Sequence, residues 1–470
     1  MILWNSQVSG NCYKVRLLLP QLGIPYERRE LSVVDRSNRA ELLGGKNPAL
    51  RVPTLELDDG RCLGESDAIL WYLGDGSRYV PEDAFERAQV LQWLATRPSR
   101  PGSGASPPSP ATLRSTPEEG PMKFSYALLP DHPVTELVDS IVLADELGFY
   151  GAYGADETYH KDQWLVAAVA ATRTKNIRLS PCVTHVILKE PTILAHSIAT
   201  LDELSNGRAE CVFSIGNIAM LDQYHVDWKS GGQIKRLREA HHVMRTMLDE
   251  GKIDFEGDFY RYTGLFTSAR PVQEHVPLKI GAMRGPKSFE LAGEIADGMH
   301  QALAYSKEAM QFATDHVRIG AERVGRDPGE LDLGAWMVTS IAEDSDAARE
   351  AARVVVAFYI PAMPREQIER HGIDPDSLQP IMDAFNVGDV ERAIELTTLE
   401  LTEKLSLSGS PDEWVERIRD EVIPTGFEHL ICAPIDPYLV EAWSGRKIGG
   451  VPDQQGQLRL IHDHVMPHFP

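Results

Sequence analysis

Residues 176–208 read NIRLSPCVTHVILKEPTILAHSIATLDELSNGR, and this stretch decides the fold of the larger part of the chain. Its first part, NIRLSPCVTH, is a short apolar run that predicts a buried strand. The remainder predicts a helix that follows the strand after a short loop. A strand followed by a helix is the repeating unit of α/β folds.

The same order continues on both sides of this unit. Upstream, 123–130 and 149–157 predict strands, each followed by an apolar-spaced helix. Downstream, the predicted buried strands are 208–217, 276–283, 298–304, 331–342 and 428–434. Eight strands with intervening helices fit an α/β fold of the closed (β/α)8 type, the TIM barrel, whose active site lies at the carboxyl ends of the strands. The alternative, a doubly wound open sheet, would want a GxGxxG fingerprint after an early strand, and the sequence has none there.

A second domain is expected because 470 residues exceed what one hydrophobic core usually serves. Residues 95–121, ATRPSRPGSGASPPSPATLRSTPEEGP, are dense in proline, serine and glycine and lack an apolar period, which predicts an extended linker. The sequence therefore predicts a small domain at 1–94 and the barrel at 122–470.

The small domain has its own order of elements. A strand at 1–5, a helix at 11–23 and a strand at 25–33 precede a two-stranded hairpin and a helix within 51–75. Through SGNCYKVRLLL, NPALRVPTL and GESDAILWYL, this part resembles the N-terminal, thioredoxin-like α/β domain of glutathione S-transferases. The resemblance covers residues 1 to about 94 and implies a glutathione site.

Glu65 and Ser66 resemble the pair that holds the γ-glutamyl end of glutathione. Ser66 also opens a predicted helix, whose free backbone amides suit a carboxylate. Pro53 resembles the family's cis-proline, and Val52 before it would offer backbone hydrogen bonds to the thiol peptide; a plain turn proline is the alternative. The group that stabilises the thiolate has candidates among which the sequence does not choose: Ser9, Asn11 and Cys12.

A complete transferase continues into an all-helical domain that forms its hydrophobic substrate pocket. Here only PEDAFERAQVLQWL, residues 81–94, precedes the linker. We therefore expect a thiol-binding or docking role for the small domain rather than transferase catalysis.

The barrel resembles the luciferase-like monooxygenase superfamily. The resemblance rests on ADETYHKDQW (155–164), on 181–208 and on GPKSFELAGEIADG (285–298). Within this superfamily, the sequence is most similar to the deazaflavin-dependent branch, typified by methylenetetrahydromethanopterin reductase, which uses coenzyme F-420. This implies an oxidoreductase that transfers a hydride to or from a small organic substrate. The alternatives are an FMN-dependent monooxygenase, a glutathione-binding module with a non-catalytic barrel, and a barrel that reduces a glutathione adduct.

The resemblance also implies the cofactor residues. Cys182 and Val183 match a bulged strand with a non-proline cis peptide that backs the deazaflavin ring; an ordinary inward-facing strand residue is the alternative for Cys182. Thr184 follows them. Gly216 and Asn217 close the next strand, where a glycine lets cofactor atoms approach. The turn predicted to bind the phosphate consists of Gly285, Pro286, Lys287 and Ser288, which offer helix amides, a hydroxyl and an ammonium.

The candidate catalytic residues end two neighbouring strands. Asp156 and Glu157 match an acidic pair beside the ring and substrate, and one of them is expected to relay a proton. His185 would orient substrate or donate a proton, although the family often has an amide there. Arg284 and His300 also stand at predicted strand ends. No metal site is expected, since no carboxylate or cysteine stands at ligand spacing from the paired histidines.

Two further expectations concern the barrel rim. Residues from about 361 to 404 resemble a helical insertion that covers the site or builds a contact in a homodimer. Coenzyme F-420 bears a polyglutamate tail, so basic residues would have to converge near the rim; the candidates are Arg208, Lys229, Lys235 and Arg236.

Composition narrows the partners. The formal charge of -22 repels phosphate backbones and anionic lipid surfaces, which argues against nucleic acid and membranes as partners. The N-terminus lacks the pattern of a secretory signal, so a cytoplasmic location is expected. Five dispersed cysteines suggest no disulfide framework. The expected partner is a small-molecule substrate, with glutathione as a second ligand.

Overall fold

The computed structural model describes residues 1–6, 9–31, 39–81, 83–95, 122–283, 285–303 and 305–470. The chain divides into two compact units, Met1–Arg114 and Ser115–Pro470. Apart from Ala95, the predicted linker lies outside the described residues, as does Arg284. Each unit is considered by itself.

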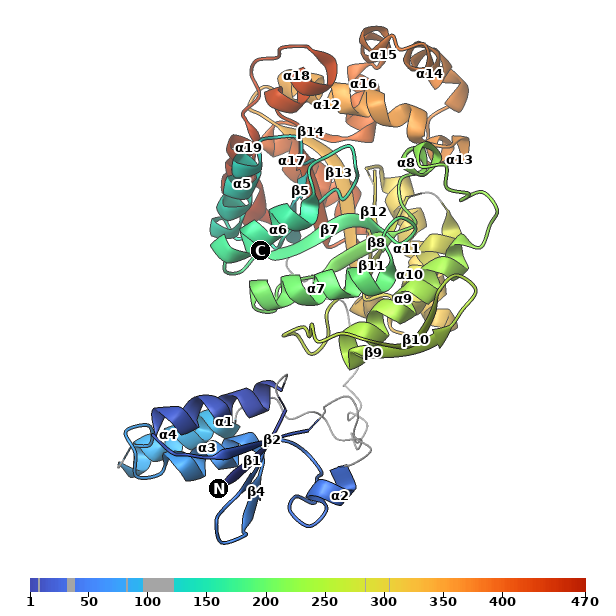
Figure 1. Cartoon of the computed structure of the whole chain (residues 1–470). Helices are drawn as coiled ribbons and strands as arrows, with labels where there is room; N and C mark the ends of the chain where they lie inside the picture. Colours follow the sequence, from blue (N-terminus) through green and yellow to red (C-terminus); the bar gives the residue numbers. More distant parts are fainter. Residues whose placement is uncertain (7–8, 32–38, 82, 96–121, 284, 304) are drawn as a thin grey trace. The chain divides into compact units, whose positions relative to one another are not determined.

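The first unit contains a four-stranded sheet in the order β2-β1-β3-β4. Strand β1 pairs in parallel with β2 and antiparallel with β3, and β4 pairs antiparallel with β3. The elements in chain order are β1 (Ile2–Asn5), α1 (Gly10–Gln21), β2 (Glu27–Glu30), α2 (Arg39–Leu43), β3 (Thr54–Glu56), β4 (Cys62–Gly64), α3 (Ser66–Gly74) and α4 (Ala84–Ala95). This β-α-β, β-β-α order confirms the predicted thioredoxin-like arrangement (Figure 1).

A small apolar core holds this unit together. Leu3 on β1, Leu55 on β3 and Ile69 on α3 are fully buried against each other and against the inner face of α1. The Val52–Pro53 peptide bond before β3 is cis, as the sequence predicted. Burial of alternate strand residues fixes the register of the sheet, because a one-residue slip would expose this core.

The second unit is a closed parallel barrel, which confirms the predicted fold. Its strands are β5 (Lys123–Leu128), β6 (Gly151–Gly154), β7 (Arg178–His185), β8 (Cys211–Ser214), β11 (Leu278–Ala282), β12 (Gly298–Gln301), β13 (Asp332–Ile341) and β15 (His429–Pro434). They follow one another in the order β12-β11-β8-β7-β6-β5-β15-β13, and the pairing of β12 with β13 closes the ring. Strand β14 (Leu407–Gly409) extends the sheet beside β13.

Helices cover the outside of the barrel (Figure 1). They are α5 (Val134–Glu146), α6 (Gln163–Arg173), α7 (Pro191–Ser205), α9 (Gln233–Glu250), α10 (Pro286–Ile295), α11 (Lys307–Arg323), α12 (Ser345–Tyr359) and α17 (Pro411–Arg417). Between β8 and β11 the chain also forms the short helix α8 (Ile218–Gln223) and an antiparallel hairpin of β9 (Lys252–Glu256) and β10 (Arg261–Phe266). The apolar faces of the helices pack on the strands, and this contact supplies most of the core.

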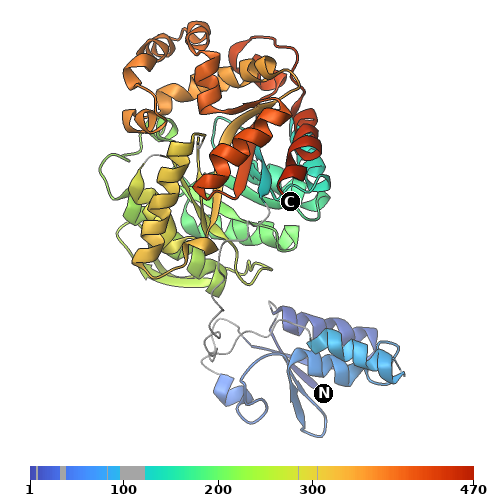
Figure 2. The same cartoon turned by 180° about the vertical axis from the view of Figure 1, so that it is seen from behind.

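The predicted insertion is helical. It contains α13 (Arg365–Arg370), α14 (Gln379–Asn386), α15 (Val390–Leu396) and α16 (Leu399–Leu405), which gather with α12 and α18 (Pro437–Ser444) at one end of the barrel (Figure 1). Helix α19 (Gln454–Leu460) packs against α5, and Figure 2 shows this C-terminal part from behind. No helix in the described part of the chain is both long and apolar enough to cross a membrane.

Charged side chains fill the barrel interior at the amino ends of the strands. Lys279 is 2% exposed; its Nζ donates to Glu210 Oε2 at 2.6 Å and also contacts Asp332. Arg178 pairs with Glu210, and His429 Nδ1 lies 3.2 Å from Asp332 Oδ2. Because each buried charge faces an opposite one, this layer packs like a core while leaving the carboxyl ends of the strands free for a site.

Candidate functional site

A cavity of about 300 Å³ opens at the carboxyl ends of the barrel strands. Its walls come from the ends of β5, β6, β7, β8, β11 and β12, from the first turns of α8, α9 and α10, and from the end of α12. The polar residues lining it are Glu157, His160, Cys182, Ser214, Asn217, Gln233, Ser288 and His300. This is the position that the barrel fold predicts for an active site.

Strand β7 carries the predicted bulge. The Cys182–Val183 peptide bond is cis, and the pairing with β8 shifts register between Cys182 and Thr184. Both Cys182 and Val183 line the cavity. Opposite them, a Cβ on Gly281 would lie 2.2 Å from Val183 Cγ1, so only glycine leaves room for the bulge there.

Beneath the bulge, Cys182 Sγ lies 3.8 Å from His300 Nδ1. Burial raises the pKa of the Cys182 thiol to about 12 and lowers the pKa of His300 to about 3. Both groups are therefore neutral near pH 7. Together they form an uncharged surface beneath the bulge. A thiol that stays protonated is a poor nucleophile.

Asp156 is held by other side chains and does not line the cavity. Its Oδ2 accepts a hydrogen bond from Thr184 Oγ1 at 2.7 Å. Lys189 Nζ donates to both carboxylate oxygens, at 2.6 Å each. Trp164 Nε1 donates to it at 2.9 Å. The carboxylate oxygens are thus occupied, and Thr184, which is fully buried, faces Asp156 rather than a ligand.

Glu157 is the member of the acidic pair that reaches the cavity. Burial raises its pKa above the ordinary value, against the opposing effects of a hydrogen bond from Asn217 and the charge of His160. Asn217 caps α8 and lines the same wall. A carboxyl group with a raised pKa beside a cavity is suited to donate a proton.

His185 lies behind the wall. It is 3% exposed and is absent from the cavity lining, and burial lowers its pKa. A Cβ added to Gly216 would lie 3.0 Å from the Cβ of His185. Gly216 also has a φ of 112°, a left-handed backbone conformation that favours glycine. The structure therefore places Gly216 at the cavity and His185 beneath it, out of reach of a ligand in the cavity.

The predicted phosphate turn begins α10. Gly285 and Ser288 line the cavity, whereas Pro286 and Lys287 are exposed and are not part of the lining. Gly285 caps the helix without a side-chain hydrogen bond, and nothing lies within 4 Å of its would-be Cβ. The first amides of α10 are accordingly accessible to an anion.

The sequence reasoning missed several residues of the cavity lining, among them His160, Trp336 and Tyr359. His160 lines the cavity, and its Nδ1 lies 2.8 Å from Asp131 Oδ1. Trp336 on β13 and Tyr359 at the end of α12 supply aromatic walls. The available signal was position, since His160 lies in the loop after a barrel strand, where functional side chains gather.

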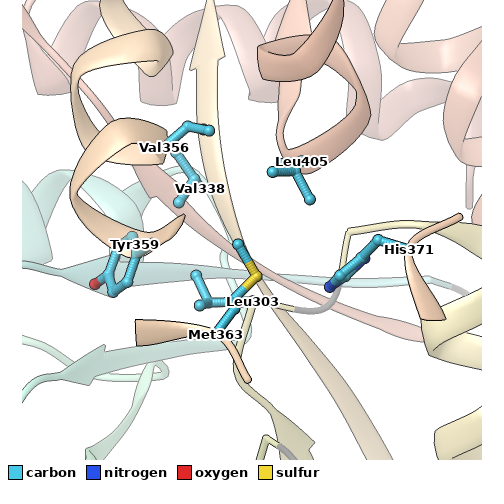
Figure 3. Close-up of a pocket in the computed structure, with 7 residues that line it drawn as sticks. All are labelled: Leu303, Val338, Val356, Tyr359, Met363, His371 and Leu405. Atoms are coloured by element: carbon cyan, nitrogen blue, oxygen red, sulfur yellow. The ribbon is translucent and has the colours of Figure 1, made fainter. Parts of the chain in front are cut away.

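A smaller apolar hollow of about 10 Å³ adjoins the cavity and shares Leu303 and Tyr359 with it (Figure 3). Its other lining residues are Val338, Val356, Met363, His371 and Leu405. His371 Nδ1 lies 2.9 Å from Ser306 Oγ. The hollow has room for about one water-sized group and is too small for a substrate.

The basic residues expected at the rim divide into two groups. Lys235 and Arg236 lie in the first turns of α9 beside the cavity residues Gln233 and Ile234, and Lys229 is exposed in the preceding loop. Arg208 is at the opposite end of the barrel, 9% exposed, where its guanidinium donates to backbone carbonyls including Ile177 O at 2.6 Å. The prediction that Arg208 contributes to the rim is wrong, because a residue just before a strand lies at its amino end.

Two histidines and Asp332 also meet in the barrel interior. The ligand atoms of His300, Asp332 and His429 lie within 4.8 Å of one another, a proximity that sequence spacing did not show. Lys279 Nζ already contacts the Asp332 carboxylate, so an ammonium takes the place that a metal ion would need. We assign no metal to this cluster.

In the first unit, the residues predicted to bind glutathione differ in how deeply they are buried. Cys12 is fully buried, and its Sγ accepts from Ser6 N at 3.3 Å, so it is unavailable to a ligand. Ser9 caps α1, and Asn11 is exposed. Glu65, at a φ of 62°, precedes α3, whose first residue is the buried Ser66.

Comparison with known proteins gives two family matches. Residues 115–429 match the family described as luciferase-like monooxygenase, and residues 3–77 match the glutathione S-transferase N-terminal domain. The two matches fall in the two compact units of the chain.

Individual relatives match the second unit. A 5,10-methylenetetrahydromethanopterin reductase from Methanopyrus kandleri is 32% identical over 361 residues, which span 74% of this chain and 99% of that protein. An F-420-dependent glucose-6-phosphate dehydrogenase from Nakamurella multipartita is 29% identical over 330 residues, 66% of this chain and 90% of that protein. The structure of the coenzyme F-420-dependent tetrahydromethanopterin reductase from Methanopyrus kandleri aligns with a TM-score of 0.68 and 30% identity, over 75% of this chain and all of that one.

Proposed function

The chain belongs to the luciferase-like monooxygenase family of oxidoreductases, and we propose that it transfers a hydride between coenzyme F-420 and a small organic substrate. The observation that carries this proposal is the cavity at the carboxyl ends of the strands, where the bulged part of β7 forms one wall and the carboxyl of Glu157 lies on another. The named relatives that use F-420 support the choice of cofactor.

The cavity residues fit a phosphorylated deazaflavin. The bulge and Gly281 make a wall that no side chain at position 281 interrupts, which suits a flat ring. Neutral Cys182 and His300 lie beneath it. At the other side, Gly285 and Ser288 present the amides and hydroxyl at the start of α10, which suit a phosphate.

When bound there, the deazaflavin supplies the hydride chemistry. The protein positions the substrate, excludes water from the cavity and supplies a proton. Glu157, with its raised pKa, holds a proton that it donates to the substrate atom next to the carbon that receives the hydride. Trp336 and Tyr359 flank this end of the cavity, and burial raises the pKa of Tyr359, which therefore stays a neutral phenol.

The lining also limits the charge of the substrate. Among the described residues, no lysine or arginine side chain lines the cavity, and the ionisable groups at the Glu157 end are a carboxyl and an imidazole. An uncharged or cationic substrate, such as an imine or an activated alkene, therefore suits the site better than a phosphorylated one.

For the first unit we propose glutathione binding without transferase catalysis. The left-handed Glu65 and the start of α3 at Ser66 support a peptide-binding edge. Binding of the full chain to immobilised glutathione, compared for the parent and Ser66→Ala, tests this role. Equal retention of both would contradict it.

The main test is titration of the full chain with coenzyme F-420 and, separately, with FMN, followed by fluorescence and calorimetry. We expect tight binding of F-420 and turnover of imines or activated alkenes with reduced F-420. Preference for FMN together with oxygen consumption would replace the proposal with an oxygenase function, and binding of neither would overturn it.

A further inference from the structure

His160 and Asp131 form a carboxylate–imidazole pair at the edge of the cavity. The two atoms that face each other, His160 Nδ1 and Asp131 Oδ1, are 2.8 Å apart, and His160 lines the cavity. One ring nitrogen is thus committed to the carboxylate. The other, Nε2, is the nitrogen left to exchange a proton with neighbouring groups.

Asp131 is fixed by three other side chains. Trp443 Nε1 donates to Asp131 Oδ2 at 2.8 Å, Lys161 Nζ donates to its backbone oxygen at 2.6 Å, and the Tyr438 hydroxyl donates to the same oxygen at 3.4 Å. Burial alone would raise the pKa of Asp131, but the hydrogen bonds from His160 and Trp443 hold it below the ordinary value. An ionised carboxylate only accepts hydrogen bonds, so it places the His160 proton on Nδ1.

The same loop brings His160 next to Glu157. Residues 157–160 form a turn in which His160 N donates to Glu157 O at 3.1 Å. The charge of His160 is one of the two effects that oppose the rise of the Glu157 pKa. The other groups acting on the Glu157 carboxyl are Asp156 beside it and Asn217, which caps α8. The charge of Glu157 in turn contributes to the raised pKa of Tyr159 and of Tyr359 on α12.

The His160–Asp131 pair is partly exposed to solvent. The His160 side chain is 10% exposed and that of Asp131 is 23% exposed. Glu157 faces the cavity, which is filled when ligands bind. The imidazole therefore offers a path for a proton from solvent to Glu157 that does not cross the occupied cavity.

We propose that His160 is a further catalytic residue that returns the proton to Glu157 after each turnover, with Asp131 as the residue that positions its ring. This rests on the function proposed above. Reduction adds a hydride to the substrate carbon and the Glu157 proton to its neighbour. His160 Nε2 then takes a proton from solvent and passes it to Glu157. Reduced F-420, when bound, would supply the hydride, and the proton released on its oxidation would go to solvent, so the balance would close without another reactant.

The first test uses the protein without cofactor. In full-length protein labelled with ¹³C at glutamate carboxyls, the Glu157 signal is assigned by its loss in Glu157→Gln. We expect the Glu157 pKa to rise further in His160→Gln, because the effect of His160 that lowers it is gone. The matched control is His132→Gln, which removes a neighbouring imidazole paired with Asp436 at 3.0 Å but absent from the cavity lining.

The second test measures turnover with reduced F-420 and an imine probe across pH. We expect His160→Gln to lower kcat about tenfold or more, to be partly rescued by added imidazole, and to bind F-420 as the parent does. Asp131→Asn should show a smaller loss in the same direction and serves if His160→Gln does not fold. Failure of the parent to bind F-420 would reject the proposed function, and the carboxyl titration would still decide the coupling.

An unchanged Glu157 titration in His160→Gln would overturn the relay. So would a kcat that His160→Gln leaves unaltered at every pH.

Discussion

Val183 on β7 and Gly281 on β11 share one space on the inner wall of the barrel: a Cβ on Gly281 would lie 2.2 Å from Val183 Cγ1. Because Gly281 has no side chain, β11 leaves the space that Val183 of the β7 bulge occupies. Since Cys182 and Val183 line the cavity, any displacement of Val183 reaches the proposed ring site directly.

Gly281→Ala should weaken coenzyme F-420 binding about tenfold, equivalent to about 1.4 kcal/mol. The added methyl forces Val183 toward the cavity, because the strand backbones on either side are fixed by their ladders. Calorimetric titration measures the change. Gly449→Ala is the matched control, since nothing lies within 4 Å of its would-be Cβ. An F-420 affinity equal to that of the control would show that the bulge does not contact the cofactor.

Glu157→Gln should reduce kcat about 100-fold or more while leaving F-420 affinity unchanged, because the amide keeps the shape and removes the proton. In the parent, burial raises the pKa of Glu157, so the protonated form persists above the ordinary range. The rate of substrate reduction should then fall as pH rises through that raised pKa. Steady-state kinetics across pH measure both effects, and a flat profile in the parent would exclude Glu157 as the acid.

Asp156→Asn provides the comparison for Glu157→Gln. It breaks the pair with Lys189, so its first effect should be on stability rather than on the pH profile. A pH profile that moves in Asp156→Asn and not in Glu157→Gln would reverse the two roles.

The strand order was predictable because buried strands and amphipathic helices alternate along the chain, and the residues after each strand therefore marked the cavity. The same rule, applied in full, would have excluded Arg208, which precedes β8 and so lies at the other end. Which of Asp156 and Glu157 faces the cavity could not be read from the sequence. That choice depends on Lys189 and Thr184, which meet Asp156 only in the folded chain.

The imidazole pair shows a second limit of sequence reasoning. His160 and Asp131 lie in different loops, and helix α18 supplies Trp443. Only the closure of the barrel brings β5, β6 and β15 side by side and their loops together. The cluster of His300, Asp332 and His429 has the same origin, because parallel pairing aligns the starts of β13 and β15.

Lys279→Met should lower the free energy of unfolding by about 3–5 kcal/mol, since it leaves Glu210 and Asp332 buried without their shared cation. Denaturant titration of the full chain measures the change in the transition of the barrel. Arg173→Met removes a surface pair with Asp139, in which both side chains are about half exposed, and should not shift the midpoint. Equal effects of the two variants would argue that solvent reaches the buried layer.

The same layer should make the barrel sensitive to acid. Burial opposes ionisation of Glu210, but Lys279 and Arg178 outweigh it and hold the pKa of Glu210 at about 2; the pKa of Asp332 is also well below its ordinary value. A depressed pKa contributes stability above the unfolded value, and this contribution is lost as pH falls through the folded value. Unfolding free energy should therefore decline between about pH 4.5 and pH 2, and Glu210→Gln should flatten that decline. A parent whose stability is constant over this range would contradict the charged layer.

The last prediction concerns the tail of the cofactor. Lys235 and Arg236 begin α9 beside Gln233 and Ile234 of the cavity wall, and Lys235 is exposed and paired with Asp258. A polyglutamate leaving the cavity there would compete with Asp258 for the ammonium. Lys235→Gln should weaken binding of intact F-420 about two- to fivefold at low salt, leave binding of tail-less F-420 unchanged, and lose its effect at high salt, because exposed charges are screened. Lys252→Gln, at the start of β9 beyond the other end of α9, is the control. If both variants weaken the binding of intact F-420 equally, the acidic tail responds only to the overall charge of the protein. If Lys235→Gln weakens the binding of both intact and tail-less F-420, the lysine acts on the ring or the phosphate instead.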